Sequence, residues 1–563
     1  MSKEQGSESA VSGSQLIKED EMAKDKEAPK KATRREFVKG AAIGAAAAAG
    51  AGVLASCSSP EGEVGLQGPA GPAGPAGPAG PSGISELEWD YETDVVVVGS
   101  GNGGLSAGIA AAQDGAGVVL VEISSTTGGG SSYSGGQIHI SGTETYEEYL
   151  ETTAKLHDPV LGKVYSDTFP QWVGWLKDIG AYVSPDPSPG RELGLLMGKG
   201  EPEPENNRAY FDSLVNIFED AGGTILVETR ALDLLTDADG TIVGLKAQGK
   251  EKILNVKAKA VILACGGFQS NPELRQRYFG READLATVMG TPYNMGDGMR
   301  MAQKLGASLS GGFSTMSGSL YPAWPHRNPQ VDVELYEKGT YIAGPDSKTS
   351  FYYLYCKVPR PSGFIMVNLN GKRFVDENAP YPRYQNAVLR QPQAMGIVIL
   401  DESLYGPGRD VPYRGFTPDQ ILASITEQGG AVVIAATISE LADELEKLPT
   451  AVHKANFLKT MGEYNEAVEA GKGAELEVAR TGGAVPMATP PFYAIPSTVG
   501  IYACFGGLAM NEYAQVLDSQ KQPISRLYAV PPTAGGIMRN TYTGMIGCAG
   551  TFGWIAGKHA AAL

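Results

Sequence analysis

The stretch that decides the fold runs from Asp94 to Glu122 and reads DVVVVGSGNGGLSAGIAAAQDGAGVVLVE. Four consecutive valines, Val95 to Val98, end in a glycine-rich turn, which is typical of a strand buried on both faces. The alanine-rich run from Leu105 to Gln113 predicts a helix packed on that strand, and Val118 to Val121 predicts a second strand. The stretch therefore predicts a strand, helix, strand unit of a parallel α/β sheet.

The turn inside this unit has the glycine spacing of a dinucleotide-binding fingerprint. Gly99 permits the tight turn, Gly101 lets a pyrophosphate approach the backbone, and Gly104 lets helix and strand pack closely. The phosphates would lie on the N-terminus of the helix. Glu122 ends the second strand, where it can accept hydrogen bonds from an adenosine ribose. Taken alone, this unit fits NAD and FAD equally well.

Composition narrows the partners and the redox chemistry. The chain has 563 residues, 42% of them apolar, and a net charge of −17, which argues against nucleic acid or an anionic membrane face as its main partner. No cysteine pair has the CxxC or CxxCH spacing of a haem or iron–sulfur site, and no metal site is expected. We therefore expect a separate electron donor or acceptor, either a protein or a soluble carrier. The cysteines are Cys57, Cys265, Cys356, Cys504 and Cys548.

Residues 1–56 have the order of an export signal. A charged run ends in TRREFVK, residues 33–39, and a mildly apolar Ala/Gly stretch follows up to Ala55, which resembles a twin-arginine signal. LASC, residues 54–57, resembles a lipoprotein box with Cys57 as the acylated residue. We expect export to the periplasm or a lipid anchor on the outer face of the cytoplasmic membrane. The alternative is cleavage nearby, with Cys57 left as an ordinary thiol.

A linker is predicted over residues 57–91. Its core, GLQGPAGPAGPAGPAGPSG at residues 65–83, has glycine at every third position, as collagen does. Six such triplets are few for a stable triple helix, so a polyproline II spacer is the simpler interpretation and a trimer is the alternative.

Later segments extend the glycine pattern. GGGSSYSGG, residues 128–136, has few side chains, so its backbone can lie against a large planar ligand. A helix is predicted over residues 210–221 and a strand over 224–227. The run VILA, residues 261–264, predicts another buried parallel strand, which ends in the glycine turn CGGF.

These elements, with Gly296-Asp297-Gly298 and the C-terminal FGWIAGKHAA, resemble the flavoprotein family of fumarate reductase and 3-ketosteroid Δ1-dehydrogenase. The resemblance runs from about Thr93 to the C-terminus. It implies an α/β fold in which a Rossmann-like domain, split in sequence, binds FAD non-covalently, and an inserted α+β domain caps it. The implied ranges are 92–310 and 490–563 for the FAD-binding domain and 311–489 for the capping domain.

The glycine pattern and the resemblance together imply a set of FAD-binding residues. Between Ala529 and Pro532 the chain departs from the family's Ala-Gly-Glu or Ala-Gly-Asn, which affects contacts to the flavin ribityl. The implied residues are Gly99, Gly101, Asn102, Gly103, Gly104, Glu122, Gly129, Gly130, Ser131, Ser134, Gly135, Gly136, Ala264, Gly266, Asp297 and Ile546.

Two tyrosines stand where the family's branches differ. Tyr381 lies four residues past Glu377, where the fumarate reductase branch has its catalytic arginine, and that branch's histidine pair is replaced by Tyr502 and Ala503. The segment ENAPY ending at Tyr381 instead resembles the ketosteroid dehydrogenase segment whose tyrosine exchanges the proton next to a carbonyl. NTYTG, residues 540–544, resembles the segment whose tyrosine, here Tyr542, holds the carbonyl oxygen with a backbone amide of Ile546 or Gly547.

Phenols suit this chemistry on their own account. Hydride transfer to the β-carbon of an enone develops charge on oxygen, which a phenol and an N–H stabilise, while a second phenol moves the α-proton. We therefore expect an exported FAD enzyme that reduces or forms a C=C bond beside a carbonyl in a bulky enone, such as a steroid. One alternative is an acrylate-type reductase that holds a carboxylate with Arg539 or Arg383. The other is a tethered flavin protein that only transfers electrons.

Overall fold

The computed structural model describes residues 87–140, 145–153, 155–186, 193–198, 204–323, 363–379, 383–405, 418–427 and 430–563. The predicted export signal, Cys57, Cys356, Tyr381 and nearly all of the predicted linker lie outside this described part. The chain divides into the units Met1–Pro78 and Ala79–Leu563, and every described residue belongs to the second.

The predicted parallel sheet is present. From one edge to the other it contains β7 (Thr224–Leu226), β3 (Val118–Val121), β2 (Val95–Val98), β11 (Ala260–Leu263), β19 (Pro523–Ala529) and β18 (Gln515–Leu517). All neighbours are parallel except β18 and β19. The valines of β2 are at most 4% exposed, and burying each side chain contributes about 1.5–3 kcal/mol. The predictions for β2, β3, β7 and β11 are confirmed, with bounds that shift by a residue.

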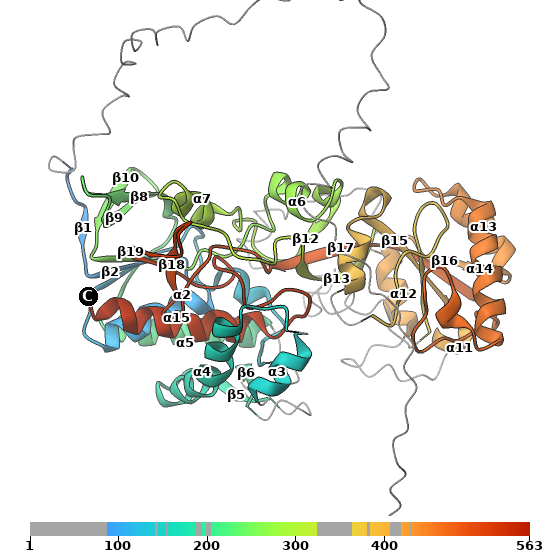
Figure 1. Cartoon of the computed structure of the whole chain (residues 1–563), viewed down its shortest axis with the longest axis horizontal. Coiled ribbons are helices and arrows are strands. Elements are labelled where there is room, and N and C mark those ends of the chain that lie inside the picture. Colours follow the sequence, from blue (N-terminus) through green and yellow to red (C-terminus); the bar gives the residue numbers. More distant parts are fainter. Residues whose placement is uncertain are drawn as a thin grey trace, which may run out of the picture. The chain divides into compact units, whose positions relative to one another are not determined.

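Helices α2 (Asn102–Gln113) and α15 (Met545–Ala561) pack closely on each other beside this sheet (Figure 1). A Cβ at Gly553 would lie 2.1 Å from the Gly103 oxygen, and one at Gly557 would lie 2.2 Å from the Ala107 oxygen. Helix α2 begins before the predicted Leu105, because Gly101 already serves as its N-cap. The layer of helices on this sheet is therefore assembled from two distant parts of the chain.

Two smaller sheets are formed by strands that alternate in sequence with those of the parallel sheet. One contains β1 (Tyr91–Glu92), β10 (Ile253–Lys257), β9 (Ile242–Gln248) and β8 (Arg230–Thr236). The other contains β4 (Gln137–Ile138), β6 (Leu195–Met197) and β5 (Val183–Pro185). The helices in this part of the chain are α3 (Tyr146–Thr152), α4 (Pro159–Asp178), α5 (Pro204–Asp220), α6 (Pro272–Tyr278) and α7 (Asp297–Gln303). Helix α5 starts before the predicted residue 210 and ends close to the predicted 221.

The remaining sheet is built around one long strand, β17 (Phe492–Cys504). Strands β12 (Thr287–Val288), β13 (Met316–Pro322), β15 (Met395–Asp401) and β16 (Val433–Ala435) pair with it, and β14 (Ile365–Val367) pairs with β15. Strands β12 and β17 fall outside the predicted insertion 311–489 but belong to this sheet. The described helices here are α10 (Arg383–Val388), α11 (Glu402–Tyr405), α12 (Pro418–Glu427), α13 (Ile438–Lys447) and α14 (Lys454–Glu469).

Candidate active site

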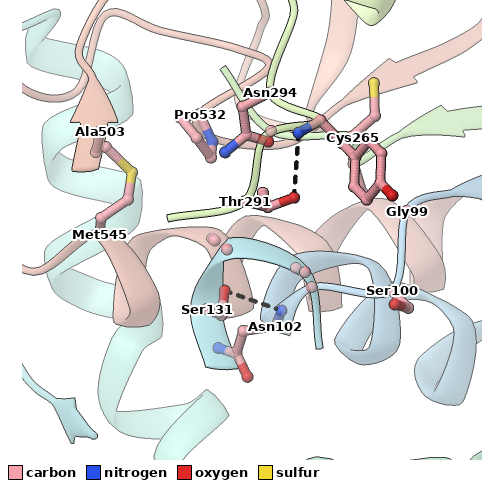
Figure 2. A pocket seen from close by; sticks show the side chains of 18 of the residues that line it. Gly99, Ser100, Asn102, Ser131, Cys265, Thr291, Asn294, Ala503, Pro532 and Met545 are labelled. Carbon is pink, nitrogen blue, oxygen red and sulfur yellow. Dashed lines mark hydrogen bonds between the residues drawn. The ribbon is translucent and has the colours of Figure 1, made fainter. Parts of the chain in front are cut away.

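One cavity lies at the carboxyl ends of β2, β3 and β11, which is where open parallel sheets bind their ligands (Figure 2). Its wall includes the fingerprint turn after β2, the glycine loop around the 3₁₀ helix η2 (Gly129–Tyr133), and the start of α7. The end of β17 and the start of α15 complete it. The wall of the cavity is therefore formed by residues from both the early and the late parts of the chain.

The three fingerprint glycines serve different purposes. Gly99 has φ +102°, and a Cβ there would lie 2.6 Å from the Ala264 oxygen. A Cβ at Gly104 would lie 1.8 Å from the Gly99 oxygen. At Gly101, however, the nearest atom would be the Ser131 hydroxyl at 3.6 Å. Protein packing thus explains Gly99 and Gly104, whereas at Gly101 a Cβ would make only ordinary contacts and packing does not require a glycine.

The start of α2 is locked in place by Asn102. Its side-chain amide donates to the Ile546 oxygen at 2.9 Å and accepts from the Tyr210 hydroxyl at 2.7 Å, and its backbone N–H donates to the Ser131 hydroxyl at 3.3 Å (Figure 2). The N-cap residue Gly101 has no side chain of its own to cap the helix. Gly101, Asn102 and Gly103 belong to the wall of the cavity, and the positive end of the helix there suits a phosphate.

Glu122 also lies on the cavity wall, and it is 4% exposed. Its carboxylate accepts from the Ser100 N–H at 2.8 Å, from the Ser100 hydroxyl, and from the Ser124 N–H at 2.9 Å. Burial raises the pKa of this carboxyl, although these hydrogen bonds act in the opposite direction. The side chain is held rigidly at the end of β3, in the place predicted for ribose recognition.

The other predicted cofactor residues mostly meet at the same cavity. Its wall includes Gly103, Gly129, Gly130, Ser131, Ser134, Gly135, Ala264, Gly266, Asp297 and Ile546. Gly104 and Gly136 are not among the wall residues. Gly136 is tied to β6 through its oxygen, which accepts from the Met197 N–H at 2.8 Å. Asp297 is ion-paired with Arg230 at 2.7 Å, so its carboxylate is already partnered.

Tyr542 lies on the wall at the α15 end of the cavity. The ring of His139, a side chain not predicted from the sequence, is 6.4 Å away and edge-on to it. Gln269, Met289 and Tyr502 are further wall residues. Figure 2 shows the side chain of Met545 extending toward Ala503, so a thioether and a methyl group face each other there. The only sequence signal for His139 was its place shortly after the second glycine loop.

Helix α15 begins at this end without a side-chain cap. Its N-cap, Gly544, has φ +102°, and a Cβ there would lie 1.8 Å from the His139 oxygen. Of the two amides considered for the carbonyl oxygen, Ile546 belongs to the cavity wall. A Cβ at Gly547 would instead lie 2.6 Å from the Phe169 ring. A phenol and a helix N-terminus thus adjoin on one stretch of wall.

The two predicted arginines lie elsewhere in the described residues. Arg539 is exposed and outside the set of wall residues, and its guanidinium lies against Gly311 and donates to the Leu156 oxygen at 3.5 Å. Arg383 is exposed at the start of α10. Within the described ranges, no cluster of three or more His, Cys, Asp or Glu side chains is placed to hold a metal ion. The described helices include none long and apolar enough to cross a membrane.

These residues fit an extended dinucleotide. Gly101 and the first turn of α2 would hold a pyrophosphate, and Glu122 would hold a ribose. The fit is supported at Gly101, which lies on the cavity wall although packing against the protein does not require a glycine there. The wall between Ala264 and Ile546 would then adjoin the redox-active ring.

Comparison with known proteins agrees with this geometry. A family model described as "FAD binding domain" matches residues 94–545. Probable fumarate reductase Ifc3 of Shewanella frigidimarina is 28% identical, over 83% of this chain and 75% of its own. Vinyl phenol reductase of Lactiplantibacillus plantarum is also 28% identical, over 83% of this chain and 96% of its own.

A solved structure shares the fold. The 3-ketosteroid Δ1-dehydrogenase of Sterolibacterium denitrificans superposes with a TM-score of 0.62 at 19% identity, covering 84% of this chain and all of that one. The predicted resemblance to both branches is thereby confirmed at the level of fold and family. FAD is the cofactor that the family model, the fingerprint and the cavity have in common. The chain belongs to the family of FAD-binding oxidoreductases.

Proposed function

We propose that this enzyme reduces, or in the reverse direction forms, a C=C bond conjugated to a carbonyl or phenol oxygen in a bulky, largely apolar substrate. The observation that carries the proposal is the adjacency of Tyr542 to the uncapped N-terminus of α15 on one cavity wall. Such a pair of donors favours an oxygen that gains negative charge during the reaction.

FAD, when bound, supplies the site that gives or takes a hydride. The residues of the chain then act on the substrate's oxygen and α-carbon. The Tyr542 hydroxyl and the Ile546 N–H donate to the oxygen as it becomes enolate-like, and each such donor contributes about 10²–10³-fold to turnover. Tyr381, outside the described residues, is proposed to give or take the α-proton.

The nature of the wall supports an apolar substrate. Met289, Ala503 and Met545 present methyl and thioether groups, and Tyr502 and Tyr542 present aromatic rings. Methionine adapts to irregular apolar shapes and contacts aromatic rings favourably. Similarity to a protein named vinyl phenol reductase agrees with a substrate whose developing charge spreads onto a conjugated oxygen.

A second candidate function is reduction of an unsaturated carboxylic acid. Similarity to a probable fumarate reductase favours it, and Arg539 or Arg383 would have to hold the carboxylate. Both side chains are exposed in the structure, so this function requires one of them to move toward the cavity.

One screen separates these functions. The flavin is reduced anaerobically, and its reoxidation is followed after adding steroid enones, vinyl phenols, or acrylate and fumarate. Rapid reoxidation by enones or vinyl phenols is expected. Reoxidation by the acids alone, abolished in Arg539→Ala, would instead establish the second candidate. Reoxidation only by a protein partner would indicate an electron-transfer protein.

Tyr381→Phe tests the proposed proton transfer. The hydroxyl is the only group lost, so turnover should fall by about 10²-fold or more while the flavin absorbance spectrum stays unchanged. The nearby Tyr384→Phe, within α10, provides a matched control for the same chemical change. Turnover close to wild type in Tyr381→Phe would remove this residue from the mechanism.

We also propose export by the twin-arginine route and a lipid anchor at Cys57. Replacing Arg34 and Arg35 by lysine should retain the protein inside the cell, with its FAD bound. Cys57→Ser should release it from membranes without affecting turnover. Export of the double-lysine variant at the wild-type level would contradict the first proposal, and unchanged membrane association of Cys57→Ser would contradict the second.

A further inference from the structure

The segment Gly536–Gly544 leads into α15 and contains Tyr542, and it is held at both ends by the α3–α4 helical hairpin. At its start, the Gly536 oxygen accepts from the Asp158 N–H at 2.7 Å, and the Ile537 oxygen accepts from the Tyr149 hydroxyl at 2.9 Å. At its end, the Gly544 oxygen accepts from the Tyr165 hydroxyl at 3.0 Å. This hairpin supplies no wall residue of the cavity, but it bonds to the segment that does.

Tyr165 is placed to act as a rigid donor. The side chain is fully buried in α4, and its ring is packed edge-on between Tyr149 and Phe169, with centroids 6.0 Å away on each side. Burial raises the pKa of the Tyr165 hydroxyl well above its ordinary value, so it stays protonated and donates. A buried tyrosine hydroxyl usually needs such a partner.

The residue that accepts from Tyr165 is Gly544, which connects Tyr542 to helix α15. Gly544 lies between Tyr542 and the first amides of α15, with a left-handed backbone. Its oxygen also accepts the first hydrogen bond of the helix, from the Cys548 N–H at 3.0 Å. The orientations of the Tyr542 phenol and the Ile546 N–H therefore both depend on the Gly544 peptide unit. The hydrogen bond from Tyr165 fixes the position of that unit.

We propose that Tyr165, supported by Tyr149, is a positioning residue that aims Tyr542 and the start of α15 at the substrate oxygen. The effect on turnover rests on the function proposed above, whereas the orientation of Tyr542 by Tyr165 does not. Oriented donors lose much of their effect when they move by about 1 Å. Loss of the Tyr165 hydroxyl should therefore lower turnover through Tyr542, without removing a group that touches the substrate.

A double-mutant cycle tests this inference. Tyr165→Phe, Tyr542→Phe and the double variant are compared with wild type as FAD-loaded full-length enzyme. Tyr165→Phe should lower kcat about tenfold with KM within about twofold, and this loss should disappear in the Tyr542→Phe background. The control is Tyr464→Phe, because Tyr464 is buried in α14 and is not a wall residue of the cavity, so the same chemical change there should leave Tyr542 unaffected.

A second readout does not depend on turnover. Pentafluorophenol is ionised at neutral pH and resembles an enolate, so its binding beside the oxidised flavin can be followed by a charge-transfer absorbance. Tyr165→Phe should weaken this binding about tenfold, and again not in the Tyr542→Phe background. If no enone reoxidises the reduced flavin, the proposed function fails, while this titration still tests the inference.

Equal losses from Tyr165→Phe in both backgrounds, or no loss in either, would overturn the inference. If Tyr165→Phe is not recovered with FAD and with a thermal midpoint near that of Tyr464→Phe, the same cycle is run with Tyr149→Phe. That variant frees the other end of the segment, and a loss of about threefold that depends on Tyr542 is expected. Additivity in that cycle would likewise overturn the proposal.

Discussion

Two helices begin on the wall of one cavity, α2 at Asn102 and α15 at Met545, and in both the N-cap residue is a glycine. At the start of α2, Asn102 stands between Gly101 and Gly103, so the cavity meets mainly backbone there. At the start of α15 it meets the side chains of Tyr542, Met545 and the facing His139. The two helix N-termini are electrostatically similar but suited to different tasks: the first to holding a cofactor, and the second to acting on a substrate.

The largest expected effect is at the α15 end. Tyr542→Phe should reduce turnover by about 10²–10³-fold, because one of two donors to the developing charge is lost. FAD content and the flavin spectrum should be those of wild type, since the α2 end is untouched. Stopped-flow reoxidation with the best enone from the screen measures the rate. Loss of FAD together with activity would show that the two ends are not separable.

At Gly101, in contrast, we expect a substitution to weaken FAD binding. Gly101→Ala places a methyl group on the backbone at the cavity wall, where it should weaken FAD binding about ten- to hundredfold. The stability of the apoprotein should barely change, because no protein atom lies within 3.6 Å of that Cβ. Fluorescence titration with FAD and urea unfolding of the apoprotein measure the two quantities.

Gly104→Ala is the matched control for Gly101→Ala. Its Cβ would lie 1.8 Å from the Gly99 oxygen, so the apoprotein should lose about 3 kcal/mol or more of unfolding free energy. If both variants lowered apoprotein stability equally, the distinction between a ligand glycine and a packing glycine would fail.

A smaller effect is expected at Glu122, and it depends on pH. Burial raises the pKa of this carboxyl in the folded apoprotein above the ordinary value of 4.5. The folded state therefore binds the proton more tightly than the unfolded state, and the stability that this gives is present at low pH and is lost as pH rises through the folded pKa.

In Glu122→Gln that pH dependence should be absent. Relative to this variant, wild-type apoprotein should become less stable as pH rises from below 4.5 toward neutral. FAD binding should weaken about tenfold through loss of a charged acceptor. Urea unfolding at several pH values measures the first effect, and parallel pH profiles of the two proteins would contradict it.

The smallest effect concerns Cys265, on the wall after β11. Burial raises the pKa of this thiol to about 11, so only about one molecule in a thousand carries the thiolate at pH 8. Alkylation of Cys265 by iodoacetamide in the apoprotein should be slow at pH 8 and should rise about tenfold per pH unit up to pH 10. Peptide mass spectrometry resolves the site. Rapid labelling at pH 8 would show that this wall is open.

The difference between the two ends also explains how far sequence reasoning reached. The unit from β2 to β3 was predictable because much of it is local: its two strands pair with each other across one helix, and Gly104 packs against Gly99, five residues earlier. The start of α2 was missed by one turn, because helix propensity disfavours glycine and Gly101 acts as the N-cap.

The α15 end was less accessible to such reasoning. Tyr542 was inferred from family resemblance, and nothing in its neighbours indicates that it meets the fingerprint. Three further wall residues come from separate parts of the chain: His139 directly follows β4, Gln269 lies in the turn after β11, and Tyr502 lies in β17. Contacts between segments so far apart in sequence have no local signature. Arg539 was a candidate to hold a substrate carboxylate because of its charge, but its side chain contacts Gly311 and Leu156.

The bond from Asn102 to the Ile546 oxygen joins residues 444 positions apart. At ordinary rates of protein synthesis, this interval corresponds to roughly 20–90 s. During that time the fingerprint exists without the helix that completes the cavity around it. A nascent chain therefore cannot hold its flavin until nearly the whole FAD-binding fold has been made. Retention of the yellow cofactor is thus a visible mark that both halves of the domain have come together.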